Sequence, residues 1–480
     1  MNLMDYLSAA PEMTLLGLIC VVLIADLFVD DEHRVLTFWM SMIALAITAW
    51  VVLATPPDGR VVVFDGSYVS DPLSQILKVT AVGFVAVAFL YARDYLRAND
   101  LHKGEYYTLG LFGLLGMMIM ISANSLLIMY LGVETLALSM YALVAIDRNN
   151  VTSAESAMKY FVLGAIASGA LLYGISWIYG VTGTLKFDEI AAAVSANPAL
   201  NSLPLWFGLA FLIVGIAFKF GAVPFHMWLP DVYQGARTPV TLYLASAPKL
   251  AALAFALRVL VDGLGDLHDV WADMILVVAV LSLLAGNVIA IAQTNIKRML
   301  GYSTIAHVGF ILLAIFCGTR KGNAASLFYT LTYIVAAAGA FGIVILLSRR
   351  GYDAENISDF KGLNARSPWF ALMMMFLMFS MAGVPPFIGF FGKLNVIDAV
   401  LSSGYPGLAV LMVLASVVGA FYYLRVVWYM YFEQGEDQAV LQASTDTRIV
   451  LSLNGVAVLA LGIVPGWLWT LCSQIALSIR

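Results

Sequence analysis

The chain has 480 residues, of which 62% are hydrophobic and 11% are charged, and its formal net charge is −5. A soluble domain carries about twice that share of charged residues, so the composition indicates a membrane protein. No basic tail or long run of charge is present, which argues against nucleic acid as a partner. Three isolated cysteines and the lack of a glycine-rich phosphate motif argue against a disulfide framework, a zinc or iron–sulfur site and a nucleotide site.

The N-terminal stretch MNLMDYLSAAPEM contains two acids and no base, which is unlike the start of a cleavable export signal. The apolar run from Thr14 to Val29 follows it and ends at a charged stretch. We therefore predict that this run is the first retained membrane span.

Apolar runs of about 18–25 residues are long enough to cross a bilayer as helices. The sequence predicts an all-α polytopic membrane protein with about fourteen such helices. Because that number is even, both termini are expected on the same side. The predicted spans are 13–29, 35–54, 73–96, 106–123, 125–146, 155–180, 204–222, 238–263, 270–292, 298–317, 324–348, 368–388, 405–432 and 448–472.

Lysine and arginine are distributed unequally between the two sets of loops, and the richer set is expected on the cytoplasmic side. The richer set holds Arg34, Arg93, Arg97, Lys103, Arg148, Arg237, Lys297, Arg298, Arg349, Arg350, Lys361, Arg366 and Arg448. The poorer set holds Arg60, Lys186, Arg320, Lys321 and Arg480. This bias predicts that both termini face the periplasm.

The sequence contains an internal repeat. YLGVETLALS (130–139) aligns with MLGYSTIAHV (299–308), and residues 153–170 align with 323–340 at nearly the same offset. GAVPF (221–225) likewise resembles GVPPF (383–387). Five helices are thus repeated, and because five is odd the second copy enters the membrane inverted, as in many transporters.

The repeat suggests a division of the chain into four parts. These are an N-terminal three-helix segment (1–105), a first five-helix repeat (106–263), a second, inverted repeat (264–432) and a C-terminal helix (433–480).

Prolines occupy equivalent late helices of the two repeats, at Pro224 and at Pro385–Pro386. Proline removes a backbone donor and clashes with the preceding turn, so we expect each helix to be broken there. Broken backbone at membrane depth is tolerated only against protein or water, which favours a functional site over a simple packing kink.

Seven basic residues lie where hydropathy places lipid, and each costs at least about 2–3 kcal/mol there unless it is paired, hydrated or able to reach the interface. Lys219 and Lys393 stand beside the two proline breaks. We interpret them as proton-carrying lysines, although a lysine snorkelling to the interface is the alternative. The full set is Lys78, Lys159, Lys219, Lys249, Arg258, Lys393 and Arg425.

Glu134 is the one charged residue of its predicted span. An uncompensated carboxylate there must be protonated or paired. We predict that it pairs with Lys219, and the alternative is a neutral glutamic acid that hydrogen-bonds across helices. Its repeat counterpart is Ser303, so the two copies differ chemically.

Further polar residues are candidates for the same pathway. Lys159, which aligns with Tyr329, and Lys249, which follows Pro248, are interpreted as relay members or as structural charges. His307 is either a relay group, because histidine titrates near neutrality, or a neutral hydrogen-bonded core residue. Snorkelling is expected for three residues nearer helix ends, Lys78, Arg258 and Arg425.

The stretches FKFGAVPFHMWLPDVYQGARTPVT, QTNIKRMLGYSTIAHVGF and MAGVPPFIGFFGKL resemble the antiporter-like membrane subunits of NADH–quinone oxidoreductase, respiratory complex I. The resemblance covers essentially all fourteen spans. One branch of that family is indicated by the motif PDVYQGA-x-TPV and by the length of the chain. Lys393 supports the same branch, because subunit M is expected to carry glutamate at that position. Arg237 is a small departure, since a small or apolar residue is expected there.

The resemblance implies specific roles. Glu134 would be the key glutamate of helix 5, Lys219 the lysine of broken helix 7, Lys249 the connecting lysine of helix 8 and Lys393 the lysine of broken helix 12. Lys159 and His307 match further positions of the polar axis. The chain would move protons while holding no cofactor of its own.

The resemblance also implies partners. NADH, FMN, iron–sulfur clusters and quinone would bind to other subunits, and the chain would lie between subunits K and M with the lateral helix of subunit L along its flank. An Mrp-type cation/proton antiporter subunit and a structural scaffold are the alternative functions. A bacterial inner membrane is favoured over the mitochondrial one.

Overall fold

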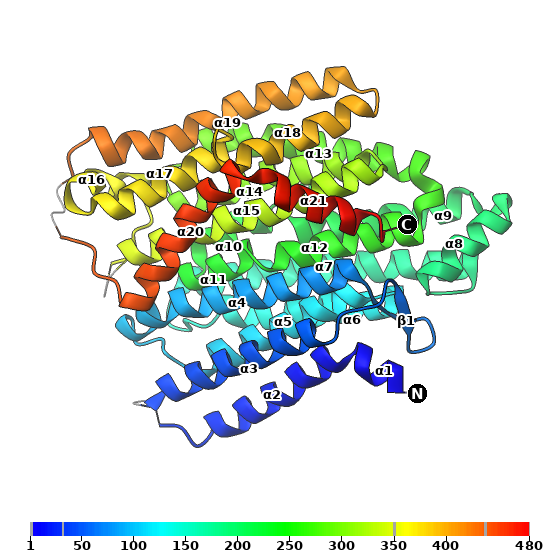
Figure 1. Cartoon of the computed structure of the whole chain (residues 1–480), viewed down its shortest axis with the longest axis horizontal. Coiled ribbons are helices and arrows are strands. Elements are labelled where there is room, and N and C mark those ends of the chain that lie inside the picture. The colour runs from blue at the N-terminus through cyan, green and yellow to red at the C-terminus, as the bar shows by residue number, and fades with distance from the viewer. Residues whose placement is uncertain (1–2, 31–32, 349–351, 436–438, 480) are drawn as a thin grey trace.

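The computed structural model describes residues 3–30, 33–348, 352–435 and 439–479, and it consists mainly of long helices that run side by side (Figure 1). Twelve helices in the described part of the chain are long and apolar enough to cross a membrane. The other two predicted spans correspond to α2 (Ala10–Asp26), one residue too short for that criterion, and to the broken helix that starts with α17 (Pro368–Ala382). The predicted polytopic helical fold is confirmed.

The N-terminal part and the first repeat form an ordered series of antiparallel crossings. The short strands β1 and β2 pair in the loop between α3 and α4, with Val62 opposite Val69. The elements are α1 (Leu3–Ser8), α2, α3 (Val35–Ala54), β1 (Val61–Val63), β2 (Tyr68–Ser70), α4 (Pro72–Ala98), α5 (Gly104–Ser122), α6 (Leu126–Val144), α7 (Val151–Thr182), α8 (Phe187–Ala196), η2 (Pro198–Leu200), α9 (Leu203–Phe220), α10 (Trp228–Gly235), α11 (Thr238–Ala245), α12 (Pro248–Ala256), η3 (Leu257–Gly263) and η4 (Gly265–Leu267).

The second repeat and the C-terminal helices follow in the same manner. Their elements are α13 (His268–Ile291), α14 (Ile296–Phe316), α15 (Arg320–Leu347), η5 (Ile357–Phe360), α16 (Leu363–Arg366), α17, α18 (Ile388–Ser402), α19 (Pro406–Phe432), α20 (Thr445–Ile463) and α21 (Pro465–Ala476).

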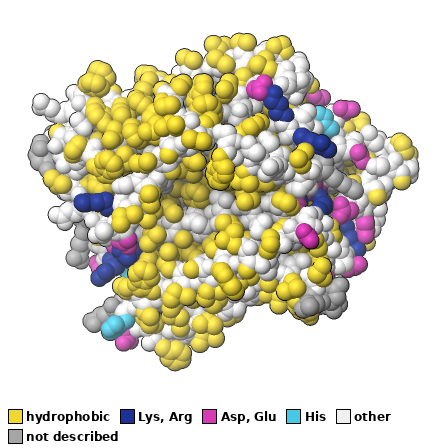
Figure 2. All heavy atoms as spheres, viewed as in Figure 1, with side chains coloured by type: hydrophobic (Ala, Val, Ile, Leu, Met, Phe, Trp, Pro, Cys, Tyr) yellow, Lys and Arg dark blue, Asp and Glu magenta, His cyan; other side chains and the backbone are white. Residues whose placement is uncertain are grey.

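Both chain ends lie at the same end of the helix bundle, as an even number of crossings requires (Figure 1). We call this the hairpin end, because β1–β2 and α8 lie there, and we call the other the opposite end, where α16 lies. Figure 2 shows that the viewed face is mostly hydrophobic, while charged side chains gather towards the two ends. This is the surface of a protein whose middle layer faces lipid. Three residues of the predicted charge bias, Arg349, Arg350 and Arg480, lie outside the described residues.

Each repeat begins with two helices in close backbone contact. A Cβ atom on Gly116 of α5 would stand 2.5 Å from the backbone nitrogen of Leu136 in α6. A Cβ atom on Gly286 of α13 would stand equally close to the backbone nitrogen of Ala306 in α14. The spacing of these glycines matches the repeat offset found in the sequence, so the same packing device opens both repeats.

The proline breaks are present in both repeats. Helix α9 ends at Phe220, and Gly221 then turns the chain with a φ of 75° before α10 begins. Helix α17 ends at Ala382, and Gly383 does the same with a φ of 85° before α18. The Val223–Pro224 and Pro385–Pro386 peptide bonds are both cis. The structure therefore places the two breaks at equivalent points.

Several predicted boundaries were incomplete. The sequence analysis ended the broken helices near residues 222 and 388 and did not assign their second halves, α10 and α18. The predicted span 238–263 is itself interrupted after Ala245 and finishes as the π-helix η3. Pro465 divides the predicted span 448–472 into α20 and α21.

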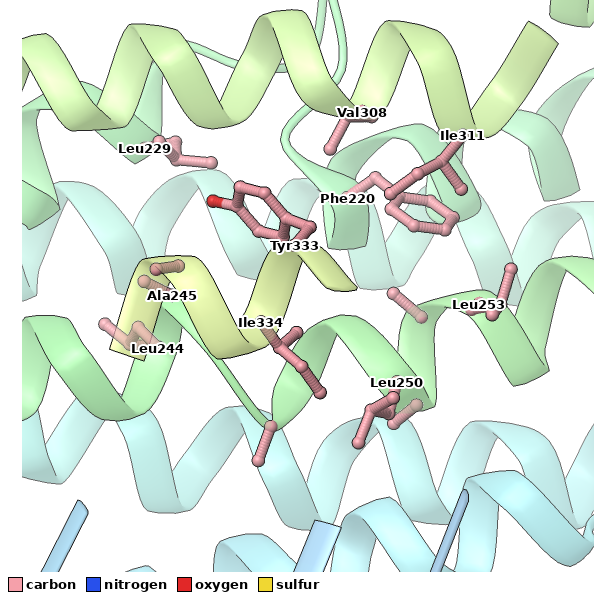
Figure 3. Close-up of a cluster of buried hydrophobic side chains, with 14 of the residues drawn as sticks. Phe220, Leu229, Leu244, Ala245, Leu250, Leu253, Val308, Ile311, Tyr333 and Ile334 are labelled. Carbon is pink, nitrogen blue, oxygen red and sulfur yellow. The ribbon is translucent and has the colours of Figure 1, made fainter. Parts of the chain in front are cut away.

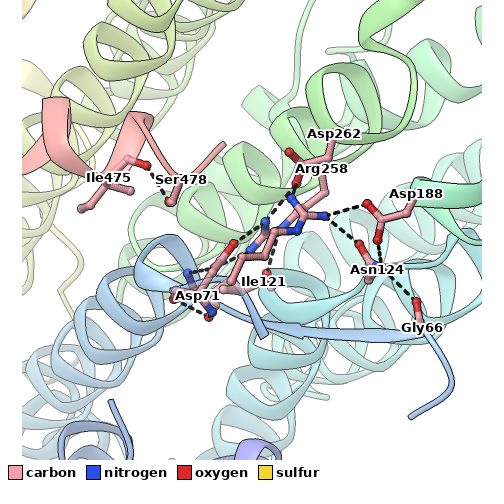
Figure 4. Close-up of polar contacts among 11 residues, drawn as sticks. Gly66, Asp71, Ile121, Asn124, Asp188, Arg258, Asp262, Ile475 and Ser478 are labelled. Atoms are coloured by element: carbon pink, nitrogen blue, oxygen red, sulfur yellow. Dashed lines mark hydrogen bonds and ion pairs between the residues drawn. The ribbon is translucent and has the colours of Figure 1, made fainter. Parts of the chain in front are cut away.

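The snorkelling prediction is wrong for Arg258, which is fully buried (Figure 4). Its guanidinium binds both carboxylate oxygens of Asp71 at 2.7 Å and reaches Asp262 at 3.0 Å. Asp71 also caps the first turn of α4, because its carboxylate accepts a hydrogen bond from the backbone of Ser74. Paired in this way, the arginine joins η3 to α4 instead of reaching for the interface.

The snorkelling prediction is also wrong for Lys78, which is 3% exposed and forms an ion pair with Glu12 at 2.7 Å. Tyr68 donates a hydrogen bond to the same carboxylate. Arg425, by contrast, is half-buried near the opposite end and donates to the carbonyls of Ile291 and Gln293. The outcome for the three residues therefore depends on whether a carboxylate lies within reach.

Replacing Arg258 with methionine should destabilise the protein by about 3–5 kcal/mol, because Asp71 would remain buried without its bidentate partner. The matched control is Arg425→Met, which leaves only backbone carbonyls unpaired and should cost less. The measurement is thermal unfolding of the detergent-solubilised protein. An unchanged midpoint for Arg258→Met would contradict this account of the cluster.

Candidate functional site

The first polar station lies where α9 meets α6. Lys219, in the last turn of α9, donates a hydrogen bond from Nζ to the carbonyl oxygen of Val133 at 3.3 Å. The next residue, Glu134, accepts a hydrogen bond from the hydroxyl of Ser168 in α7. Lys219 and Glu134 are both partly exposed at the surface of the chain.

The predicted ion pair between Lys219 and Glu134 is not formed in this structure. Instead, the carboxyl group of Glu134 hydrogen-bonds across to α7, which is the alternative that the sequence analysis left open. Lys219 still lies close to Glu134, because it binds the carbonyl oxygen of Val133, the residue that precedes Glu134. Lys219 of α9 therefore contacts the turn of α6 that carries Glu134, but the two groups have separate hydrogen-bond partners.

Lys249 forms the second station, at the broken end of α9. It is 2% exposed, and its Nζ donates a hydrogen bond to the carbonyl oxygen of Phe220 at 2.8 Å. Phe220 is the last residue of α9, where unpaired carbonyls carry the negative end of the helix dipole. The break in α9 therefore creates the acceptor that holds Lys249.

Lys393 repeats this arrangement in the second half of the chain. It is 8% exposed, and its Nζ donates to the carbonyl oxygen of Ala382, the last residue of α17, at 2.8 Å. The ammonium also lies 5.5 Å from the centre of the Phe310 ring, within the range of a cation–π contact. Sequence reasoning found both lysines, but it did not predict that each binds the end of a broken helix.

These contacts suit a lysine that gains and loses a proton. A carboxylate partner would be left as an unpaired buried charge when the lysine became neutral, at a cost of several kcal/mol. The C-terminal end of a helix carries only about half a negative charge, shared among its unpaired carbonyls, so less is lost when the proton leaves. Lys249 and Lys393 thus contact partial charges, whereas Lys78 contacts the full charge of Glu12.

His307 lies in α14 between two tyrosines. Its Nδ1 is 2.7 Å from the hydroxyl of Tyr329, and its Nε2 is 2.8 Å from the hydroxyl of Tyr423. A neutral imidazole has one donor and one acceptor, and each hydroxyl can serve as either, so both ring nitrogens are satisfied. The two tyrosines come from α15 and α19, and sequence reasoning did not identify Tyr423.

Lys159 is not brought to the buried stations. Its side chain is 46% exposed and forms ion pairs with Glu155 at 2.8 Å and Asp231 at 3.0 Å. Asp231 also binds Arg298 at 2.6 Å. This surface network joins α7, α10 and α14, and the motif WLPDVYQG contained the signal for Asp231.

An apolar cluster lies between α12, which carries Lys249, and α14, which carries His307. In Figure 3, Leu250 and Leu253 of α12 lie opposite Val308 and Ile311 of α14, with Phe220, Tyr333 and Ile334 between them. The polar residues of the two repeats therefore form separate stations with apolar side chains between them.

The chain matches the family model described as NADH:quinone oxidoreductase/Mrp antiporter, transmembrane, over residues 123–419. The chain therefore belongs to this family of antiporter-like membrane subunits. NADH-quinone oxidoreductase subunit N of Thioalkalivibrio sulfidiphilus is 54% identical over 469 residues, covering 98% of each chain. Subunit N of Thiobacillus denitrificans is 49% identical, covering 99% of this chain and 98% of that one. The predicted branch of the family is thus confirmed as that of subunit N.

Solved structures agree with this assignment. A chain of respiratory complex I from Thermus thermophilus with bound aureothin is 30% identical, with a TM-score of 0.82 and coverage of 96% of this chain and 98% of that one. A chain of the Mrp complex from Dietzia is 21% identical, with a TM-score of 0.85 and coverage of 100% and 98%. The likeness to the Mrp complex shows a shared fold alone.

Gly383→Ala should move Lys393 away from its acceptor. The new Cβ would stand 2.9 Å from Cδ of Lys393, and the left-handed backbone conformation would cost about 1–2 kcal/mol. Gly404→Ala is the matched control, because Gly404 has a φ of 90° but open space around its Cβ position. Both variants should unfold at lower temperature, and a high-resolution structure should show Lys393 displaced from Ala382 in Gly383→Ala alone. An unmoved Lys393 would contradict the prediction.

Proposed function

We propose that the chain is a proton-translocating subunit of the membrane arm of NADH-quinone oxidoreductase. The observation that carries the proposal is the pair of buried lysines, Lys249 and Lys393, each held by the terminal carbonyl of a broken helix in its own repeat. The names of the subunit N relatives suggest which reaction provides the energy. NADH would be oxidised and quinone reduced on other subunits of the complex.

Protons would enter from the cytoplasmic side towards Lys219 or Lys249, cross the middle of the membrane and leave by way of Lys393. His307 lies within the second repeat and would relay protons towards Lys393. Lys159, with Glu155 and Asp231, would contribute at the surface next to α10. Water entering the apolar cluster of Figure 3 would complete the path.

Glu134 would control Lys219 by pairing with it in one state and releasing it in another. The present structure supports the released state, in which Glu134 hydrogen-bonds to Ser168 and Lys219 to Val133. A charge pair about 4 Å apart is worth about 4 kcal/mol at an effective dielectric constant of about 20. Moving one charge against 100 mV costs about 2.3 kcal/mol, so forming or breaking the pair is large enough to gate the step.

The arrangement in the complex follows from the family. Subunits K and M would be the neighbours, the lateral helix of subunit L would run along the flank, and NADH, FMN, iron–sulfur clusters and quinone would be held elsewhere. The opposite end, which carries more lysine and arginine, would face the cytoplasm of a bacterium. Both termini would then face the periplasm.

Lys219→Ala should lower the number of protons pumped per NADH oxidised, because the pathway loses the ammonium that Glu134 controls. The measurement uses the complete enzyme reconstituted into vesicles, with assembly checked on a native gel. The control is the double variant Lys78→Met with Glu12→Gln, which removes another buried lysine together with its partner. An unchanged ratio in assembled Lys219→Ala enzyme would make this lysine structural and count against the proposal.

A further inference from the structure

A continuous chain of neutral hydrogen-bonding groups runs through the second repeat. The hydroxyl of Ser303 hydrogen-bonds to that of Tyr423, Tyr423 bonds to Nε2 of His307, and Nδ1 of His307 bonds to Tyr329. All four side chains are at least nine-tenths buried. They come from α14, α15 and α19, so three helices have to pack together to form the chain.

At two positions of this hydrogen-bond chain, the second repeat has a neutral residue where the first repeat has a charged one. Ser303 aligns with Glu134, and Tyr329 aligns with Lys159. Glu134 and Lys159 can carry formal charge, whereas serine and tyrosine can each donate and accept a hydrogen bond while remaining neutral. The second repeat thus keeps the ability to pass a proton at these positions without fixing a charge there.

The Tyr329 end of the chain lies close to Lys393. The Tyr329 ring stacks on Phe310 with centroids 5.5 Å apart, and Phe310 lies under the ammonium of Lys393. A Cβ on Gly392 would stand 3.3 Å from the Tyr329 ring.

A small cavity extends from the chain to the break between α17 and α18. His307, Tyr329, Thr332, Tyr333, Ser380 and Gly389 are among the residues that line it. Most of its lining is apolar, but His307, Tyr329, Thr332 and Ser380 each contribute a polar side chain to it. The cavity thus lies between Tyr329 and the break that holds Lys393.

We propose that Ser303, Tyr423, His307 and Tyr329 conduct protons between α14 and Lys393 as a neutral hydroxyl–imidazole relay. The inference rests on the proposed function and adds Ser303, Tyr423 and Tyr329 to it. A proton arriving at Ser303 lets its hydroxyl proton move to Tyr423, Tyr423 passes its own hydroxyl proton to Nε2, Nδ1 passes its proton to Tyr329, and Tyr329 releases its hydroxyl proton towards neutral Lys393. One proton enters and one leaves, so every group stays neutral, and rotation of the hydroxyls with tautomer exchange of the imidazole restores the starting polarity.

Neutrality matters because these groups are fully enclosed. An isolated charge in such surroundings costs several kcal/mol, and the described residues around His307 provide hydroxyl groups and aromatic rings as its nearest partners. A relay that moves protons by shifting hydrogen bonds avoids holding a charge on any one member. Lys393, with its carbonyl partner, is then the place where the charge resides.

Tyr329→Phe and Tyr423→Phe test the inference, because each removes one hydroxyl and keeps the ring that packs the core. Both variants should lower the protons pumped per NADH oxidised in reconstituted complete enzyme. Tyr106→Phe is the matched control: the Tyr106 side chain is also fully buried, but its hydroxyl donates to the carbonyl oxygen of Pro239, outside the chain. The control should pump like the unaltered enzyme.

Unchanged pumping in Tyr329→Phe and Tyr423→Phe would overturn the relay, and so would an equal loss in Tyr106→Phe. Ser303→Ala provides a second break in the chain if a tyrosine variant fails to assemble. Lys393→Ala in the same assay separates the two proposals. A loss in Lys393→Ala alone would reject only the relay, whereas normal pumping in all variants would reject the proposed function as well.

Discussion

The interaction on which this structure depends is the bond between a lysine ammonium and the last carbonyl of a broken helix. Without the breaks, the carbonyls of Phe220 and Ala382 would accept hydrogen bonds within their own helices. With them, Lys249 and Lys393 find partial negative charge in the protein interior without a carboxylate. The glycines and prolines that end α9 and α17 are therefore part of the chemistry and not only of the packing.

The buried charges fall into two groups that differ in their partners. Arg258 and Lys78 face carboxylates and join helices firmly near the hairpin end, where Asp71 also caps α4. Lys249 and Lys393 face carbonyls. Since a fully paired charge is costly to neutralise, the first group suits a rigid frame and the second suits a change of protonation state.

Much of this was predictable from the sequence, because hydropathy and proline position are strong local signals. The spans, the repeat, the two breaks and the residues Lys219, Lys249 and Lys393 all followed from it. Helices α10 and α18 were missed because each continues a span after a break, where a length criterion no longer applies.

Side-chain partners were harder to predict, because they depend on helices far apart in the chain. Arg258 was expected to reach the membrane interface. Instead, packing of α4 brings Asp71 close enough to bind the guanidinium of Arg258. Lys219 was expected to bind Glu134, but the carboxyl group of Glu134 accepts a hydrogen bond from Ser168 of α7 instead. Tyr423 carried no sequence signal, since two adjacent tyrosines in a mostly apolar helix look like ordinary core residues.

The apolar cluster between α12 and α14 has a consequence for energy conservation. A protein that pumps protons has to prevent them from leaking back. A permanent water-filled path between Lys249 and His307 would let the proton gradient dissipate whenever the enzyme is idle. In the proposed path, the buried side chains of Leu250, Leu253, Val308 and Ile311 would form the apolar barrier between the two polar stations. Proton transfer along the proposed path would then require water to enter this apolar cluster, which would keep the path closed while the enzyme is at rest.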